Sequence, residues 1–192
     1  METQVHDQIQ QWAERIAASD NEAFDALFRA TYKDYVLYAM RYTKQQSSAN
    51  DIVQDVFVKL WQKRTSIDPE KSLLSYLYQM VRNRALNDIR DNARVDTGLE
   101  LHTLTTDPQQ DDSEADGEFD LGNKMKKWIK LLPQRQQEAF ELSRTEGLDH
   151  EEIANIMGVA VRTVNNHIMG ALKQLRKHYE AYQTKQSTGK YG

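Results

Sequence analysis

The sequence predicts an all-α protein made of two small helical domains joined by a flexible acidic linker, with a helix-turn-helix in the second domain. Apolar residues recur at intervals of three and four over most of the chain, and runs that alternate as strands do are almost absent. Proline occurs only at positions 69, 108 and 133. Between the two helical parts, residues 95–122 contain nine acidic residues, no basic residue, and both proline and glycine, which favours a linker.

The composition is typical of a soluble globular protein. The chain has 192 residues, of which 39% are hydrophobic, and it has no cysteine. We therefore expect no disulfide, no thiolate nucleophile and no Cys-based zinc site. The five histidines lie at spacings unsuited to a shared metal, so we expect neither a metal nor a cofactor. No run of about 18 apolar residues and no signal-peptide pattern occurs, which predicts a cytoplasmic protein.

Charge is distributed unevenly along the chain, although the net charge is only −4. Residues 1–94 hold 13 basic and 13 acidic residues, whereas residues 123–192 hold 12 basic and 7 acidic residues. The acidic linker, residues 95–122, separates these two parts. We therefore expect one domain over residues 1–94 and a second over residues 123–192, ending in a basic tail.

The apolar periodicity predicts eight helices in chain order. Four precede the linker, over residues 4–18, 21–44, 48–64 and 71–93. Four follow it, over residues 123–131, 134–146, 149–157 and 161–182. The second helix carries aromatic residues at helical spacing, and we assign these to core packing: Phe24, Phe28, Tyr32, Tyr35 and Tyr42.

The helix predicted over residues 48–64 has an apolar face and a charged face. The residues expected to pack inward are Ile52, Val53, Val56, Phe57 and Leu60. The residues expected to point outward are Asp51, Gln54, Asp55 and Lys59.

The helix predicted over residues 71–93 also has two different faces. Its apolar stripe consists of Leu74, Leu77, Val81, Ala85 and Ile89. The opposite side carries Tyr76, Met80, Asn83, Asn87, Arg90 and Arg94 at steps of three and four. Aromatic, amide and guanidinium groups on one face suit unstacked bases and a single-strand backbone, so we interpret this side as a surface for single-stranded nucleic acid.

Residues 147–179 have the pattern of a helix-turn-helix. Asp149 can cap the first helix while Glu152 reaches back to it, and Gly147 suits the left-handed end of the preceding helix. Ile153, Ala154 and Met157 are expected to face inward. Gly158 then falls where the turn between the two helices needs a residue that tolerates positive φ.

The second helix of this motif is expected to read DNA. Its predicted buried stripe consists of Val161, Val164, Ile168, Leu172 and Leu175. Its other face carries Arg162, Asn165, Asn166, Met169 and Lys173. Two amides and an arginine lie near the N-terminus, the part of such a helix that enters a major groove, and the segment KQLRKHY supplies cations for phosphates.

Three segments together resemble the signature segments of extracytoplasmic-function (ECF) sigma factors. They are DIVQDVFVKLW, YLYQMVRNRALNDIR and LLPQRQQEAFELSRTEGLDHEEIANIMGVAVRTVNNHI, in the family's order. The resemblance implies a protein that binds core RNA polymerase, recognises the −10 and −35 promoter elements and helps to open the duplex. It also implies an anti-sigma factor as a partner. It implies no catalytic residue and no enzymatic activity.

The resemblance assigns roles to particular residues. Binding to the polymerase clamp falls to Asp51, Gln54, Asp55 and Trp61. The resemblance implies that Ile67 and Asp68 lie in the loop that captures a flipped base of the −10 element, and that Asn83 belongs to the adjoining pocket. The helix face that carries Asn83 also carries Tyr76, Asn87 and Arg90, which we assign to the same element. Binding to the −35 element falls to Arg162, Asn165, Asn166 and Met169, with Lys173, Arg176 and Lys177 on phosphates. Gly170 departs from the family, which often has a basic residue there, and so puts one phosphate contact in doubt.

The sequence disfavours two other classes of protein. A stand-alone helix-turn-helix regulator would use residues 1–94 as a sensing or dimerising domain, but no heptad run or long dimerising helix is evident. An enzyme would need a nucleophile with its base, paired carboxylates in a cleft, or a glycine-rich phosphate loop. The sequence has only eight glycines and none of these patterns.

Overall fold

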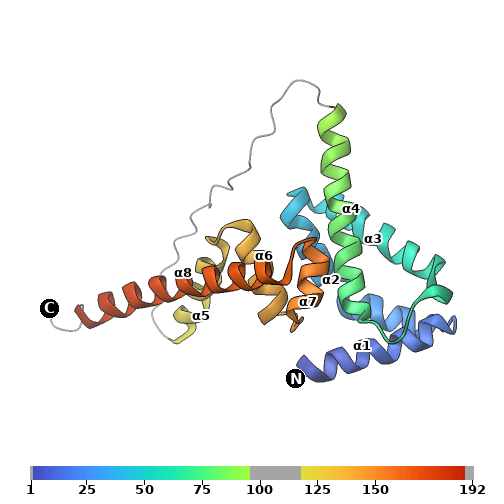
Figure 1. Cartoon of the computed structure of the whole chain (residues 1–192), viewed down its shortest axis with the longest axis horizontal. Helices are drawn as coiled ribbons and strands as arrows, with labels where there is room; N and C mark the ends of the chain where they lie inside the picture. Colours follow the sequence, from blue (N-terminus) through green and yellow to red (C-terminus); the bar gives the residue numbers. More distant parts are fainter. Residues whose placement is uncertain (1, 96–117, 189–192) are drawn as a thin grey trace. The chain divides into compact units, whose positions relative to one another are not determined.

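The computed structural model describes residues 2–95 and 118–188, and these residues form helices joined by turns (Figure 1). The first group of helices is α1 (Glu2–Ala17), α2 (Asn21–Thr43), α3 (Gln46–Gln62), the short 3-10 helix η1 (Arg64–Ser66) and α4 (Leu73–Val95). The second group is α5 (Glu118–Lys130), α6 (Gln134–Arg144), α7 (His150–Met157) and α8 (Val161–Thr188). All eight predicted helices are therefore present, and the all-α prediction is confirmed.

The chain divides into two compact units. The first contains α1 to α4, and the second contains α5, α6, α8 and residues 150–154 of α7. Most of the predicted linker, residues 96–117, lies outside the described residues. Residues 118–122 were expected to belong to the linker, but they form the start of α5.

The core of the first unit is built around α2, which packs against α1, α3 and α4. Side chains from all four helices are fully buried, including Ile16, Leu27, Val53, Leu60 and Leu77. All five residues of α3 that were expected to pack inward are buried. Burial of these stripes fixes the rotation of each helix about its own axis, and so decides which side chains face outward.

Aromatic rings fill much of this core. Tyr35 is completely buried, and its ring meets that of Tyr78 with centroids 4.8 Å apart in an edge-to-face arrangement. Phe28 and Phe57 meet in the same way at 4.9 Å. The other aromatic residues assigned to the core, Phe24, Tyr32 and Tyr42, are half-buried and each contacts a further ring. The core role predicted for the aromatic residues of α2 is therefore confirmed.

One residue of the predicted apolar stripe of α4 is not in the core. Leu74, Leu77, Val81 and Ala85 are buried, whereas Ile89 is 36% exposed. The reason is the length of α4, whose C-terminal turns extend past the other helices of the first unit (Figure 1). Periodicity indicates which side of a helix is apolar, but it does not indicate where the neighbouring helix ends.

In the second unit, α8 packs against α5 and α6. The core cluster contains Leu132, Ala171 and Leu175, and half-buried apolar side chains pack around it: Met125, Trp128, Ile129 and Phe140. The indole of Trp128 also stacks on the imidazole of His178, with the rings 5.8 Å apart and nearly parallel. These contacts hold α8 by one side over most of its length.

The predicted buried stripe of α8 was wrong at two positions. Val164, Ile168 and Leu175 are buried, but Val161 is 43% exposed and Leu172 is 37% exposed. Ala171, rather than Leu172, continues the buried row. Steps of four, three and four from Val164 stay on one side of a helix, whereas Leu172 lies about 100° around from Ala171. Val161 is the first residue of α8, where the helix surface is less covered.

Gly170 has a packing role. A Cβ atom built at Gly170 would lie 3.0 Å from the side-chain amide of Gln136 on α6. Gln136 also accepts a hydrogen bond from the side-chain amide of Gln174, at 3.0 Å. Gly170 therefore lies on the side of α8 that faces α6. A longer side chain at this half-buried position would have to displace Gln136 before it could reach a phosphate.

The N-terminus of α2 is capped by an ionised carboxylate. Asp20 accepts hydrogen bonds from the backbone N–H groups of Glu22 and Ala23, at 2.8 and 3.1 Å, and Arg15 donates to it at 2.8 Å. The bond from Ala23 and the bond from Arg15 lower the pKa of Asp20 below its ordinary value. The charged form of Asp20 is therefore the form that stabilises the fold.

We predict that this carboxylate contributes to stability in a pH-dependent way. Because its pKa is lowered in the folded state, its contribution is present above the unfolded pKa of about 4 and is lost as the pH falls through the folded pKa. Asp20→Asn keeps a capping side chain but removes the charge. Urea denaturation from pH 7 to pH 2 should show wild type more stable than Asp20→Asn near neutrality, with the two converging at low pH. A pH-independent difference would contradict the charge assignment.

Candidate nucleic-acid and protein interfaces

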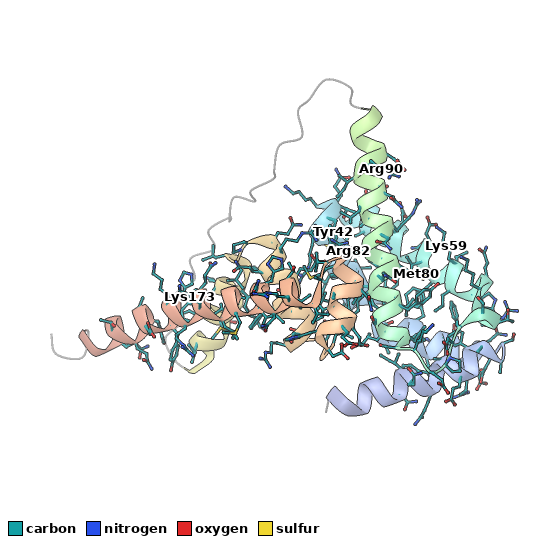
Figure 2. The ribbon with its side chains drawn as sticks, in the orientation of Figure 1. Tyr42, Lys59, Met80, Arg82, Arg90 and Lys173 are labelled. Carbon is teal, nitrogen blue, oxygen red and sulfur yellow. The ribbon has the colours of Figure 1, made fainter. Side chains whose placement is uncertain are left out.

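The outward face of α3 is arranged as predicted. Asp51, Gln54, Asp55 and Lys59 are all exposed, and Val58 beside them is 54% exposed. Figure 2 shows Lys59 among the outward side chains of α3. The face thus offers two carboxylates, an amide and an apolar group on one rigid helix. A basic protein surface with an apolar contact point would complement it.

One carboxylate of this face is already paired within the first unit. Arg84 of α4 donates from Nη2 to Oδ2 of Asp55 at 3.0 Å, in an ion pair that is partly exposed on both sides. The Nε atom of Arg84 is buried and has no hydrogen-bond partner among the described residues. A carboxylate can accept several hydrogen bonds, so Oδ1 of Asp55 stays available to a partner. The pair fixes the direction in which Asp55 presents that oxygen.

Trp61, assigned with these residues, is partly covered by its neighbours. Its ring lies 5.0 Å from that of Phe24, and the guanidinium of Arg64 lies over it at 4.4 Å from the ring centre. Trp61 is half-buried as a result. Its first role is therefore to close the first unit between α2 and η1, and only its exposed edge can contact a partner.

The loop between η1 and α4 presents Ile67 and Asp68. Ile67 is half-buried and Asp68 is exposed. Asp68 accepts a hydrogen bond from the backbone N–H of Glu70 at 3.1 Å and pairs with the amine of Lys71 at 3.2 Å. These two bonds, the first being the stronger influence, lower the pKa of Asp68. An ionised acceptor and a half-covered apolar side chain thus lie next to each other on the surface.

The predicted face of α4 is largely exposed. Tyr76, Asn83, Asn87 and Arg90 are exposed and Met80 is half-buried, while the side chain of Arg94 lies outside the described residues. Figure 2 shows Met80 and Arg90 on α4, with Arg90 toward its C-terminal end. These residues follow one another at steps of four, three, four and three, so they share one side of the helix. The arrangement can offer a ring to stack on, two amides and a cation to a single strand.

The helix-turn-helix forms with the local contacts that the sequence predicts. The carboxylate of Asp149 accepts from the N–H groups of Glu151 and Glu152 at 2.8 Å, and the carboxylate of Glu152 accepts from the N–H of Asp149 at 2.9 Å. Gly147 and Gly158 have φ values of 65° and 64°. Ile153, Ala154 and Met157 are buried. The predicted capping box and both left-handed glycines are confirmed.

All seven residues of α8 assigned to DNA are exposed. They are Arg162, Asn165, Asn166, Met169, Lys173, Arg176 and Lys177. At 100° per residue they lie within a sector of about 120°, opposite the buried row that ends at Leu175. Met169, at its centre, is 59% exposed. Figure 2 shows Lys173 on the surface of α8. The face has amides and an arginine at its N-terminal end and three cations further on, the pattern of a helix that reads bases and contacts phosphates.

Residues 2–95 and 118–188 contain no group of three histidine or acidic residues that could hold a metal ion. None of the helices in that part is long and apolar enough to cross a membrane.

Sequence reasoning did not identify Arg84 as part of the candidate interface. The ion pair joins Asp55 to a residue 29 positions away on another helix, so no local spacing signals it. It also did not predict the burial of Arg82, which is only 5% exposed although it is charged. Both arginines lie in the segment VRNR on α4, beside Asn83.

Comparison with protein families gives two matches along the chain. The model described as Sigma-70 region 2 matches residues 27–95, and the model described as Sigma-70, region 4 matches residues 125–175. Together the two matches cover more than half of the chain. The first contains α3, the loop and α4, and the second contains the helix-turn-helix up to Leu175.

Several proteins are similar over nearly the whole chain. The chain is 29% identical to the ECF RNA polymerase sigma factor RpoE of Cereibacter sphaeroides over 162 residues, which cover 83% of this chain and 87% of that protein. It is 25% identical to the RNA polymerase sigma-H factor of Pseudomonas aeruginosa over 193 residues, which cover 90% and 94%. It is 28% identical to the ECF RNA polymerase sigma-E factor of Haemophilus influenzae over 179 residues, covering 84% and 90%.

Two solved structures are similar in fold. One is the sigma factor RpoE of Bartonella quintana in complex with the anti-sigma factor NepR, with a TM-score of 0.58, 25% identity, and coverage of 82% of this chain and 96% of that one. The other is CnrH in complex with the cytosolic domain of CnrY, with a TM-score of 0.58, 19% identity, and coverage of 91% and 98%. At 19% identity the second likeness concerns the fold alone.

We predict that the turn of the helix-turn-helix depends on Gly158. Gly158 has positive φ and nothing lies within 4 Å of where its Cβ would be, so Gly158→Ala adds backbone strain without a clash. The expected loss is roughly 1–2 kcal/mol of unfolding free energy, measured by urea denaturation with circular dichroism. Gly122→Ala is the control, because Gly122 is helical and equally uncrowded. Equal effects of the two substitutions would show that φ at Gly158 is not limiting.

Proposed function

Because the chain belongs to the sigma-70 family, as one of its extracytoplasmic-function members, we propose a division of labour between its parts. The protein is an RNA polymerase sigma factor, which joins core RNA polymerase and directs it to promoters. Residues 1–94 dock on the polymerase clamp and recognise and melt the −10 element. The segment between α4 and α5 tethers the two domains, and α5 to α8 form the domain that recognises the −35 element. The observation that carries this division is the order of the two family matches, each over helices with an exposed polar face.

Docking uses the outward face of α3. Asp51, Gln54 and Asp55 meet a basic surface of the polymerase, and Asp55 is held in position by Arg84 at 3.0 Å. Trp61 takes part only through its exposed edge, because Phe24 and Arg64 cover the rest of its ring. Since the ion pair of Asp55 is partly exposed, it fixes geometry more than it adds stability.

Recognition of the −10 element uses the loop and α4 together. Ile67 and Asp68 line the site for a base that leaves the stack, and Asn83 contributes an amide beside it. Tyr76, Asn87 and Arg90 contact the single strand that opening produces. Their exposure on one side of α4 supports this role, because stacking on a ring and pairing with phosphates both need accessible groups.

Recognition of the −35 element uses the outward face of α8. Arg162, Asn165, Asn166 and Met169 face base edges in the major groove. Lys173, Arg176 and Lys177 contact phosphates and set the register. Base-edge contacts supply the sequence preference, whereas phosphate contacts supply affinity that does not depend on sequence.

The remaining properties follow from this function. The sigma factor RpoE of Bartonella quintana was solved with its anti-sigma factor, and we propose that a protein of that class binds the present chain as well. Because its partner is RNA polymerase, the chain acts in the cytoplasm. It has no catalytic residue of its own, and the bond chemistry of transcription belongs to the polymerase. No observation favours the stand-alone regulator.

We predict that charge reversal on α3 weakens docking. Asp51→Lys with Asp55→Lys should weaken binding to core polymerase at least about tenfold, because like charges then face each other. The helical content should stay unchanged by circular dichroism. Asp25→Lys with Asp34→Lys is the matched control, since both are exposed acids on α2. Undiminished binding of the α3 variant in a fluorescence titration with core polymerase would remove α3 from the docking surface.

We predict that base reading and phosphate contact separate on α8. Asn166→Ala should cost about 1–3 kcal/mol at one base pair of the −35 element and relax the preference there. Lys173→Ala should weaken all promoters alike and reduce the salt dependence of binding. Both can be measured by transcription from a promoter library with core polymerase. If the two variants lose activity in the same pattern, the division into reading and positioning residues is wrong.

A further inference from the structure

The loop that carries Ile67 and Asp68 is attached to α1 and to the turn after it. η1 begins the loop at Arg64, and the loop ends where α4 begins at Leu73. Contacts to the α1 region are made at both ends of this stretch, by Arg64 on one side of the two tip residues and by Pro69 and Lys71 on the other. α1 itself lies outside residues 27–95, the part matched by the family model.

The first attachment runs through Arg64. Its Nε donates to Oγ of Ser19 at 2.9 Å, its Nη1 donates to the carbonyl oxygen of Trp61 at 2.8 Å, and its guanidinium lies over the ring of Trp61. Ser19 lies in the turn between α1 and α2 with a φ of 67°, and its N–H donates to the carbonyl of Ile16 at 2.8 Å. The start of the loop is therefore bound to a fixed turn.

The second attachment runs through Gln10 of α1. Its side-chain amide donates to the carbonyl oxygen of Pro69 and also lies 3.4 Å from that of Lys71. Gln10 is half-buried, and its neighbours Ile9, Ala13 and Ile16 are buried in the core. Burial of these apolar residues fixes the rotation of α1, so the amide of Gln10 is held where the loop passes.

The loop also contains two backbone hydrogen bonds between residues three positions apart. The N–H of Ile67 donates to the carbonyl of Arg64 at 3.2 Å, and the N–H of Lys71 donates to that of Asp68 at 3.1 Å. Ile67 therefore ends one hydrogen-bonded turn and Asp68 begins the next, and each turn is attached to the α1 region. A segment fixed in this way loses less conformational freedom when a ligand binds to it.

We propose that α1 is a brace for base capture, and that Gln10 and Ser19 are positioning residues for the −10 element. They touch no DNA. They hold the loop so that Ile67 and Asp68 already form the site before a base leaves the stack. The inference rests on the proposed function of the loop, and it extends recognition of the −10 element to a helix outside the family match.

The test uses the full chain with core polymerase and two promoters. One is a promoter selected from a random library by the wild-type complex, and the other is the same promoter with an abasic site at the captured −10 position. Promoter opening is followed by permanganate reactivity. Gln10→Ala removes the second attachment. Ser19→Gly removes the first while glycine tolerates the positive φ. Gln8→Ala is the control, because Gln8 is exposed on α1 and bonds only to Gln11 among the described residues.

On the intact promoter, Gln10→Ala and Ser19→Gly should each slow opening about 3- to 10-fold, the effect of one hydrogen bond. On the abasic promoter both should match wild type, since no base is captured. Binding to core polymerase should match that of Gln8→Ala. Equal slowing on both promoters, or no slowing on either, would show that Gln10 and Ser19 do not position the loop for base capture. If wild type itself opens the two promoters equally, the proposed role of the loop fails instead.

Discussion

The burial of one apolar stripe on each of α3, α4 and α8 is the interaction on which the rest of the structure depends. An α-helix that packs by one side must expose the other, and packing fixes which side that is. The buried stripe of α3 includes Val56 and Leu60, and that of α8 includes Val164 and Ala171. Every candidate contact with polymerase or promoter, apart from the loop at Ile67, therefore lies on a rigid helix whose rotation is already set.

Rigid faces matter because a sigma factor must offer two chemistries side by side in one small unit. The outward face of α3 carries carboxylates, and that of α4 carries amides, a tyrosine and arginine. The two helices pack against each other, so these groups belong to one small unit. The pair between Asp55 and Arg84 lies where these chemistries meet. Arg84 of α4 pairs with a carboxylate on the outward face of α3. The proposed docking face and the proposed strand-binding helix are thus joined by a direct contact.

Features that depend on interactions between residues close in the sequence could be predicted from the sequence alone. Periodicity located all eight helices, and the capping box at Asp149 and the glycines at 147 and 158 formed as their residue types require. Features set by tertiary packing could not be read in this way. Ile89 and Leu172 were expected to be buried, but their exposure depends on where a neighbouring helix ends or which residue continues a buried row. The attachments at Arg84 and Gln10 span 29 or more positions.

This chain selects promoters as a subunit of RNA polymerase, which can be tested by selection from a random duplex library. The library would be bound and transcribed with the full chain alone and with the chain plus core polymerase. We expect two sequence blocks at a fixed spacing upstream of the start site to be enriched only when core polymerase is present, and the enriched duplexes to be transcribed. Enrichment of a single or palindromic site by the chain alone, unchanged by core polymerase, would contradict this expectation.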